Sequence, residues 1–118
     1  MKIYVSHSLQ YDYKNELYKP LRELGLNKTW DIFLPHETDM EINSKEQIKS
    51  SDFVLAEVSF SSTGQGIELG WAEMMNIPII CIYKEGGKAS RWINILTNKV
   101  IVYKNAEDMI TKIEEVLR

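Results

Sequence analysis

The sequence contains little cysteine and no long apolar run, and both absences limit what the protein can be. Among the 118 residues there is 1 cysteine, Cys81, which cannot form a disulfide within the chain. A reducing compartment, the cytoplasm, is therefore expected. No apolar stretch approaches the roughly 18 residues that a membrane-spanning helix needs, and the N-terminus lacks the pattern of a signal peptide. We therefore expect no association with a membrane.

Positive charge is also scarce. The chain has 14 lysines and arginines against 17 aspartates and glutamates, which gives a net charge of −3. This balance argues against a protein that holds a nucleic acid polymer by a broad positive field. The hydrophobic content of 44% and the charged content of 26% are those of a globular protein rather than a disordered one. Since no linker or repeat divides the sequence, a single domain over residues 1–118 is expected.

Several sequence motifs that are typical of cofactor-binding and catalytic sites are missing. No G-x-G-x-x-G follows the first apolar segment, and there is neither a G-x-x-x-x-G-K-[ST] loop nor a G-x-S-x-G elbow. The two histidines, His7 and His36, have no cysteine or acid at metal-ligand spacing. We expect no metal and no cofactor. Each histidine taken alone is better explained as an exposed loop residue than as a stacking or hydrogen-bonding group.

What the sequence does contain is a series of five short apolar segments rich in β-branched and aromatic residues. In three of them the apolar run is nearly continuous, which is typical of strands buried on both faces of a parallel sheet. The five predicted strands are Lys2–Ser6, Asp31–Leu34, Asp52–Val58, Pro78–Tyr83 and Lys99–Tyr103.

Helical patterns lie between these segments. Pro20 interrupts the first pattern, so that helix is expected either to kink there or to start late. The third pattern is apolar nearly all round, which predicts a buried helix, and Asn105 is the expected N-cap of the last one. The predicted helices are Tyr13–Leu24, Ser44–Ser50, Gly66–Asn76, Ser90–Leu96 and Ala106–Leu117.

Alternating strands and helices predict a doubly wound, three-layer α/β domain with a five-stranded parallel sheet. Ligands of such folds bind beyond the carboxyl ends of the strands, near the point where the strand order reverses. The loops expected to form a site are Ser6–Asp12, Pro35–Glu41, Ser59–Gly66 and Lys84–Ser90.

The loop Ser59–Gly66 combines small hydroxyl residues with Gly64 and Gly66 and leads directly into a helix. Main-chain N–H groups at such a helix start can hold a phosphate, and glycines let a ligand approach the backbone. The alternative is structural: Ser62 caps the helix, and Gln65 completes a capping box.

Two acids stand out from their surroundings. Glu68 lies in the first turn of the most apolar helix, close to the expected ligand. A partly desolvated carboxylate there can attack an electrophilic carbon or take a proton; alternatively, it is a surface residue that complements the helix dipole. Glu57 interrupts a buried strand, and we interpret it as a paired structural anchor rather than a ligand contact.

Residues 52–59 (DFVLAEVS) and 62–72 (STGQGIELGWA), together with residues 2–6 and 33–37, carry a family resemblance. They resemble the signature of the nucleoside 2-deoxyribosyltransferase superfamily, in order along nearly the whole chain. The resemblance implies a flavodoxin-like fold and cleavage of the N-glycosidic bond of a nucleoside or nucleotide. It implies no cofactor.

The resemblance also implies roles for individual residues. Glu68 matches the nucleophile, which forms a glycosyl-enzyme on the anomeric carbon; Tyr4 matches a tyrosine near the sugar and this nucleophile, and His36 a histidine near the base. Ser62 stands where transferases acting on free nucleosides carry an aspartate. A serine there resembles the branch that hydrolyses 2′-deoxynucleoside 5′-monophosphates, in which Ser8 matches a second phosphate-contacting serine.

Other positions depart from the family pattern. Ser44 takes the place of an aspartate that positions the sugar, for which Asp39, Glu41 or Glu46 is a candidate substitute, and Gln10 takes the place of an arginine. Ser90 matches a phosphate-contacting serine from a neighbouring subunit, so a homodimer is expected. The leading hypothesis is a hydrolase of nucleoside 5′-monophosphates. A base-exchanging deoxyribosyltransferase and a non-catalytic nucleotide-binding module remain as alternatives.

Overall fold

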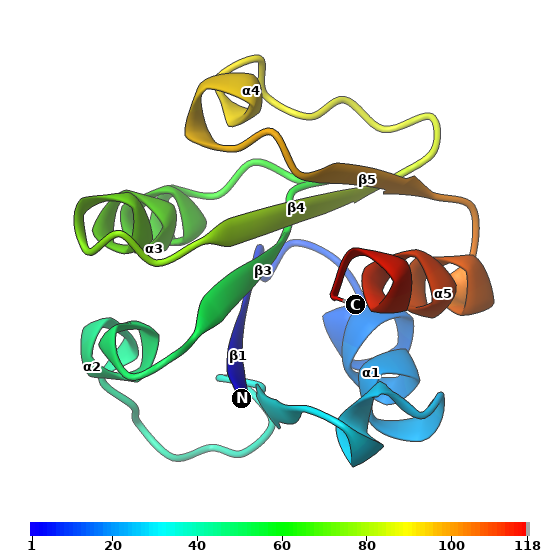
Figure 1. The fold of residues 1–118 in the computed structure, drawn as a ribbon, viewed down its shortest axis with the longest axis horizontal. Helices are drawn as coiled ribbons and strands as arrows, with labels where there is room; N and C mark the ends of the chain where they lie inside the picture. Colours follow the sequence, from blue (N-terminus) through cyan, green and yellow to red (C-terminus); the bar gives the residue numbers. More distant parts are fainter. Residues whose placement is uncertain (118) are drawn as a thin grey trace.

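A computed structural model describes residues 1–117. Its core is one sheet of five parallel strands, as the sequence predicts, and the strands lie in the order β2-β1-β3-β4-β5 (Figure 1). The strand order reverses between β1 and β3, so the loops that follow these two strands diverge and leave a crevice between them. The strands are β1 (Lys2–His7), β2 (Asp31–Phe33), β3 (Phe53–Glu57), β4 (Ile79–Lys84) and β5 (Val100–Tyr103).

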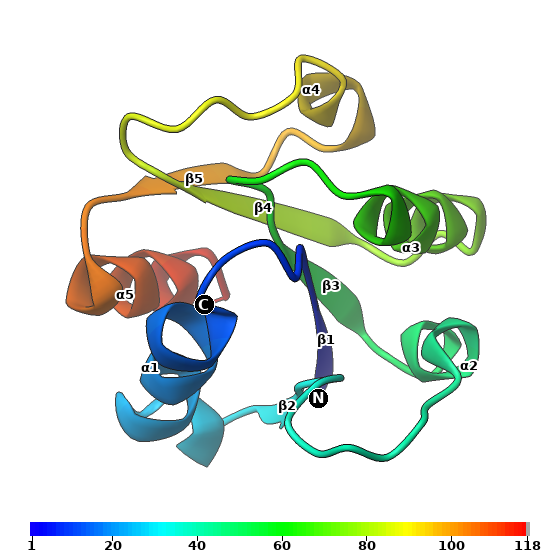
Figure 2. The same cartoon turned by 180° about the vertical axis from the view of Figure 1, so that it is seen from behind.

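Helices cover both faces of the sheet, which confirms the three-layer prediction. α1 (Lys19–Glu23) and α5 (Ala106–Leu117) lie on one face, and α2 (Ser44–Lys49), α3 (Thr63–Met74) and α4 (Ile93–Leu96) lie on the other (Figures 1 and 2). The structure also contains a 3₁₀ turn over Leu26–Lys28. Among residues 1–117, no helix has the length and apolar character to cross a membrane.

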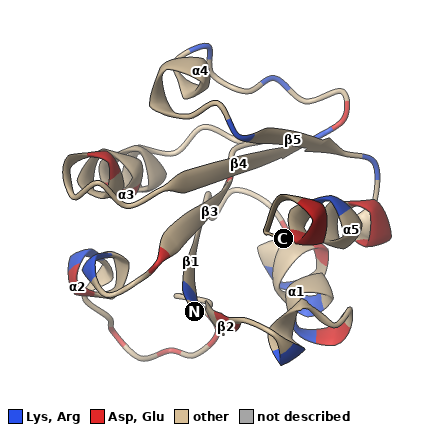
Figure 3. Ribbon diagram, in the orientation of Figure 1, with Lys and Arg blue, Asp and Glu red and all other residues tan. Residues whose placement is uncertain are grey.

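Alternation along the strands divides the core into two apolar clusters. On β1, Ile3 and Val5 pack with α1 and α5, whereas Tyr4 packs with α2 and α3 on the other face. Charged residues lie mostly on the helices and loops rather than along the strands (Figure 3). The carboxyl ends of β1 and β3 are exceptions to the apolar interior, because Ser6 and Glu57 are buried there. Polar groups are therefore concentrated at the edge of the sheet where a ligand is expected.

Pro20 lies at the start of an α-helix that begins late, as one of the two sequence alternatives describes, and a π-helical turn precedes it. Residues Lys14–Tyr18 form a π-helical turn, and the Lys19 N–H donates to the Lys14 carbonyl five residues earlier. α1 begins at Lys19 with Pro20 in its first turn. Proline has no N–H and crowds the carbonyl four residues before it. The wider π turn accommodates this missing bond, so the helical path continues through the proline.

The prediction that the third helix is buried all round is wrong. On α3, Leu69 and Ala72 are buried, but Ile67 is 49% and Met74 is 83% exposed. The helix packs only one face against the sheet and leaves part of its apolar surface uncovered within this chain. α3 also starts three residues earlier than Gly66, because Ser62 caps it.

The last two helices differ in how closely they follow the sequence pattern. α4 is a short helix inside the predicted Ser90–Leu96 range. α5 has the predicted bounds, and the Asp108 N–H donates to Asn105 Oδ1 at 2.8 Å, which confirms the N-cap. A strong apolar stripe and a good cap define α5 locally, whereas Ser90–Leu96 has neither.

Candidate active site

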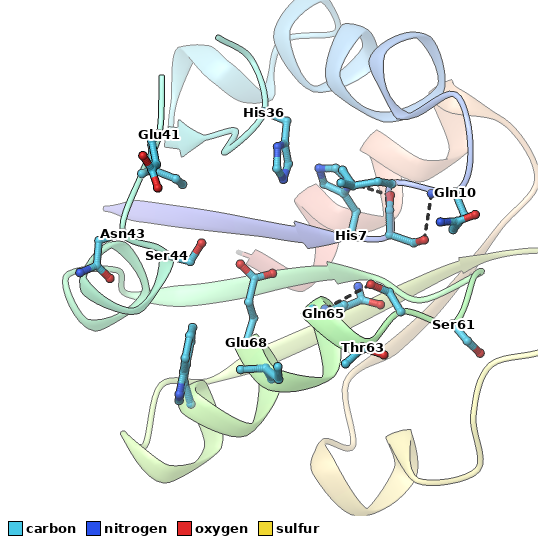
Figure 4. Close-up of a pocket in the computed structure, with 17 residues that line it drawn as sticks. His7, Gln10, His36, Glu41, Asn43, Ser44, Ser61, Thr63, Gln65 and Glu68 are labelled. Atoms are coloured by element: carbon cyan, nitrogen blue, oxygen red, sulfur yellow. Dashed lines mark hydrogen bonds between the residues drawn. The ribbon is translucent and has the colours of Figure 1, made fainter. Parts of the chain in front are cut away.

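A cavity of about 1130 Å³ opens at the carboxyl ends of β1 and β3 (Figure 4). Its walls come from the loops that follow β1, β2 and β3, from the start of α2 and from one side of α3. Three of the four loops expected to form a site therefore do so, and Lys84–Ser90 does not. The lining residues are His7, Ser8, Leu9, Gln10, His36, Glu41, Ile42, Asn43, Ser44, Ser61, Ser62, Thr63, Gly64, Gln65, Ile67, Glu68 and Trp71.

Glu68 projects from α3 toward the middle of this cavity (Figure 4). Its two carboxylate oxygens accept hydrogen bonds from two side chains of β1: Ser6 Oγ donates to Oε1 at 2.9 Å, and the Tyr4 hydroxyl donates to Oε2. Tyr4 and Ser6 are two residues apart on a strand, so they point to the same face of the sheet. These two bonds hold a half-buried carboxylate with its remaining lone pairs toward the cavity.

Tyr4 is fully buried and does not line the cavity itself. Burial raises the pKa of its phenol, and the neighbouring Glu68 carboxylate raises it further. The phenol therefore stays protonated and acts as a hydrogen-bond donor. The Tyr4 hydroxyl therefore contacts the Glu68 carboxylate from the side of the sheet and does not face the cavity.

The start of α3 forms a hydroxyl-rich end of the cavity. Ser62 Oγ accepts from the Gln65 N–H at 3.3 Å, which confirms that Ser62 is the N-cap. The Gly66 N–H donates to the Ser62 carbonyl at 3.1 Å, so it is engaged in the helix, and Gly66 does not line the cavity. The N–H groups of Thr63 and Gly64 remain at the open helix end. Capping and anion binding are therefore compatible at this loop.

The predicted capping-box role of Gln65 is wrong. Its Nε2 donates to the main-chain carbonyls of Ser6 at 3.1 Å and Glu57 at 2.7 Å instead of reaching back to the N-cap. Gln65 is 5% exposed. It therefore ties α3 to the ends of β1 and β3, the two strands that flank the crevice, and fixes the depth at which α3 places Glu68.

His7 is not the exposed loop residue that the sequence led us to expect. It is the last residue of β1 and is 6% exposed, and its ring nitrogens contact the Ser8 carbonyl at 2.8 Å and the Tyr18 hydroxyl at 2.6 Å. Burial lowers its pKa to about 4, so it is neutral at pH 7. His36 is exposed as expected and packs edge-on against His7, with ring centroids 5.6 Å apart.

Ser8 and Gln10 complete the wall opposite the start of α3. Ser8 is buried, and its Oγ accepts from the Gln10 N–H at 3.0 Å. This bond uses a lone pair of Ser8 and leaves its hydroxyl proton free to be donated to a ligand. Gln10, which stands in place of an arginine, also lines the cavity.

The remaining predicted site residues divide into those that line the cavity and those that do not. Ser44 and Glu41 line the cavity, whereas Asp39 and Glu46 do not. Ser90 is exposed on the segment before α4 and is also absent from the lining. Of the three candidate substitutes for the family aspartate, only Glu41 therefore lines the cavity.

Glu57 is the buried anchor that the sequence predicts. It is 1% exposed and accepts from the Ser59 N–H at 2.6 Å, from Ser59 Oγ at 3.0 Å and from the Tyr103 hydroxyl. Burial raises its pKa, and these hydrogen bonds oppose that shift. Glu57 does not line the cavity, so its role is to fix the loop that follows β3.

Among the residues that the structure describes, no lysine or arginine lines the cavity. An anion bound there would be held by N–H groups and hydroxyls at the positive end of the α3 dipole. Sequence reasoning missed Ile42, Asn43, Ile67 and Trp71 as lining residues, whereas Ser61 and Thr63 lie in the loop Ser59–Gly66 that was expected to form the site. Ile42 and Asn43 lie between Glu41 and Ser44, but Ile67 and Trp71 were assigned to a buried helix.

No model of a known protein family matches the chain. A stretch of 42 residues, 36% of the chain, is 43% identical to the "Putative 2′-deoxynucleoside 5′-phosphate N-hydrolase 1" of Syntrophotalea carbinolica. This match spans 30% of the length of that protein.

Comparison with solved structures covers nearly the whole chain. The Clostridium botulinum CMP N-glycosidase BcmB has a TM-score of 0.68 at 24% identity, over 97% of this chain and 99% of that one. The chain shares its fold. A 2-deoxyribosyltransferase from Bacillus psychrosaccharolyticus has a TM-score of 0.61 at 18% identity, and the match covers 92% of this chain and 90% of that one. A conserved protein from Enterococcus faecalis has a TM-score of 0.73 at 18% identity, and the match covers 98% of both chains. The flavodoxin-like α/β fold that the resemblance implies is thus the fold that this chain shares with these proteins.

Proposed function

We propose that this protein hydrolyses the N-glycosidic bond of a nucleoside or deoxynucleoside 5′-monophosphate and releases the free base and the sugar 5-phosphate. The observation that carries the proposal is the placement of Glu68. Its carboxylate is held by Tyr4 and Ser6 within a cavity whose neighbouring wall is the start of α3. A fixed nucleophile beside an anion-binding helix end suits a substrate with a phosphate and an electrophilic sugar carbon.

The reaction proceeds in two displacements at the anomeric carbon. One oxygen of Glu68 bonds to this carbon as the C–N bond to the base breaks; the bonding electron pair leaves with the base, which takes up a proton. Water then attacks the same carbon, its proton is lost to solvent, and the bond to Glu68 breaks. This is the logic of retaining glycosidases, with an oxocarbenium-like transition state at each step.

The phosphate is held without a basic side chain. The N–H groups of Thr63 and Gly64 and the hydroxyls of Ser8 and Ser62 supply the donors. No carboxylate occupies the N-cap, where an aspartate would repel the phosphate. His36, on the loop that follows β2, is the proposed contact to the base. No metal or cofactor is needed for these steps.

The relatives support this proposal by the activities in their names, an N-hydrolase of 2′-deoxynucleoside 5′-phosphates and an N-glycosidase of CMP. The solved 2-deoxyribosyltransferase favours a second candidate, in which a free base rather than water takes the sugar from Glu68. Hydrolysis and transfer share the first step, in which Glu68 takes the sugar, and differ only in whether water or a base then accepts it. Ser44, in place of the family aspartate, motivates a third candidate, a module that binds nucleotides without turnover.

One assay separates the three candidates. The protein is incubated with ribo- and deoxyribonucleoside monophosphates, and free base is followed by chromatography, with and without an added labelled base. Release of base without an acceptor supports hydrolysis, and incorporation of the label supports transfer. Glu68→Gln should abolish either activity while the circular dichroism spectrum is unchanged. Saturable nucleotide binding with no base released from any nucleotide overturns the proposal in favour of the third candidate.

We also propose that the active form is a homodimer. The cavity is open, and the exposed apolar side chains of Ile67 and Met74 lie on α3, the helix that carries Glu68. A second copy packed on this face would cover them and bring residues such as Ser90 toward the neighbouring cavity. Sedimentation equilibrium of the purified protein tests this, and a monomer at assay concentrations would contradict it.

A further inference from the structure

The cavity has two chemically different ends. Ser61 and Thr63 lie on one side of Glu68, and Glu41, Asn43 and Ser44 lie on the other (Figure 4). The base and the 5′-phosphate of a nucleotide are attached on either side of the sugar ring oxygen. If the phosphate lies at the start of α3 and the sugar over Glu68, the base extends toward the end formed by Glu41 and Asn43.

Glu41 gives this end a strong hydrogen-bond acceptor. An ionised carboxylate accepts hydrogen bonds and donates none. Glu41 forms no ion pair or hydrogen bond with another side chain among residues 1–117, so its acceptor capacity is available to a ligand. A base that presented a carbonyl oxygen to it would be repelled.

Asn43 adds a donor two residues away. Its Oδ1 accepts from the Glu46 N–H at 3.2 Å as the N-cap of α2, which fixes the orientation of the amide. With the oxygen engaged, the Nδ2 hydrogens are the part of this amide that remains for a ligand. The loop therefore offers a carboxylate acceptor and an amide donor at the same end of the cavity.

We propose that Glu41, with Asn43 beside it, selects bases that carry an exocyclic amino group. This inference rests on the proposed function, because it requires a nucleotide in the cavity. Cytosine and adenine each present an amino donor next to a ring-nitrogen acceptor, which complements the acceptor and donor of the loop. Uracil and hypoxanthine present a carbonyl next to an N–H, which opposes both.

The preference is measured as binding, so that it does not depend on turnover. The dissociation constants of CMP, UMP, AMP and IMP, each in ribose and deoxyribose form, are determined for the Glu68→Gln protein by calorimetry. Within each pair only the amino or oxo group and the adjacent ring nitrogen differ, so phosphate and sugar contacts cancel. The amino member should bind about tenfold more tightly than the oxo member, as for a good amide or carboxylate contact to a base edge.

A second substitution shows whether Glu41 is responsible. Adding Glu41→Gln to the Glu68→Gln protein should reduce the preference to about twofold or less, because the neutral amide can present either a donor or an acceptor. Asp39→Asn is the matched control: it removes a carboxylate from the same loop outside the cavity lining and should leave the preference unchanged.

The outcomes separate this inference from the proposed function. Equal affinity within each pair, a preference for the oxo member, or a preference that survives Glu41→Gln overturns the role of Glu41, whether or not the wild-type protein releases base. A preference lost in Glu41→Gln supports it, even if the wild-type protein releases no base and the proposed hydrolysis is wrong. Failure of every nucleotide to bind overturns both.

Discussion

The Tyr4 hydroxyl donates a hydrogen bond to the Glu68 carboxylate, joining the centre of β1 to the first half of α3. The same pairing of phenol and carboxylate occurs on the other face of the sheet, where Tyr103 donates to Glu57. The two pairs differ in their surroundings: Glu68 lines the cavity, whereas Glu57 is enclosed by protein. Their similarity provides a matched test of what the Tyr4 bond contributes.

Tyr4→Phe should lower kcat for base release about tenfold or more, because the hydrogen bond that orients Glu68, the proposed nucleophile, is lost. KM should change little, since Tyr4 does not line the cavity. Steady-state kinetics with a nucleoside monophosphate measure both quantities. Tyr103→Phe removes the equivalent hydroxyl on the other face and should lower the midpoint of thermal unfolding without this fall in kcat. Equal kinetic effects of the two substitutions would contradict a positioning role for Tyr4.

Ser62→Asp separates capping from phosphate binding. Aspartate is as good an N-cap as serine, so the free energy of unfolding should change by less than about 1 kcal/mol. The new carboxylate faces the phosphate, and nucleotide affinity should fall about tenfold or more. Calorimetric titration and urea unfolding measure the two effects. Asn105→Asp makes the same kind of change at the cap of α5, outside the cavity, and should alter neither. Undiminished nucleotide affinity in Ser62→Asp would place the phosphate elsewhere.

His7 should make the protein sensitive to acid. Burial lowers its pKa from 6.5 to about 4 in the folded state. The unfolded chain therefore binds a proton first as the pH falls, so the stability that His7 contributes is complete above pH 6.5 and is lost between pH 6.5 and 4. The loss amounts to about 3 kcal/mol at most.

Urea unfolding at several pH values checks this sign and size. His7→Gln, which cannot take up the proton, should flatten the fall in stability between pH 6.5 and 4. His36→Gln, which changes the exposed histidine, should leave the fall in place. If the wild-type protein and His7→Gln show parallel pH profiles, another group is responsible.

Much of the fold follows from local patterns. The continuous apolar runs around β3 and β4 can only be buried on both faces, so the parallel sheet and its helical layers follow from the sequence. Asn105 and Ser62 act as caps because a cap depends on residues a few positions away. Glu57 was predictable as an anchor for a related reason, since an acid inside a buried strand has to be paired.

The parts that could not be predicted depend on distant contacts. His7 looks like a loop residue until Tyr18, eleven positions away, supplies a partner for its ring. Trp71 looks like a core residue, but it is only partly buried, because no element within residues 1–117 covers that face of α3 fully. The cavity lining at Asn43 depends on the path of the loop between β2 and α2, which has no periodic pattern to fix it.

Gln65 is another residue whose role depends on contacts that are distant in the sequence. Its Nε2 donates to the carbonyls of Ser6 and Glu57, so Gln65→Glu would place a carboxylate oxygen against two carbonyl oxygens. Repulsion and the loss of both bonds should lower the free energy of unfolding by about 2–4 kcal/mol in urea at pH 7.

Gln47 is the matched control, because its side chain faces a positive charge instead of carbonyl oxygens. Gln47 Oε1 accepts from Lys2 Nζ at 2.6 Å, so Gln47→Glu converts a neutral contact into an ion pair and should leave stability unchanged or slightly raised. If Gln65→Glu is no more destabilising than Gln47→Glu, Gln65 does not tie α3 to the sheet. Because this tie sets the position of Glu68, the destabilised Gln65→Glu protein should also release base more slowly under conditions in which it is fully folded.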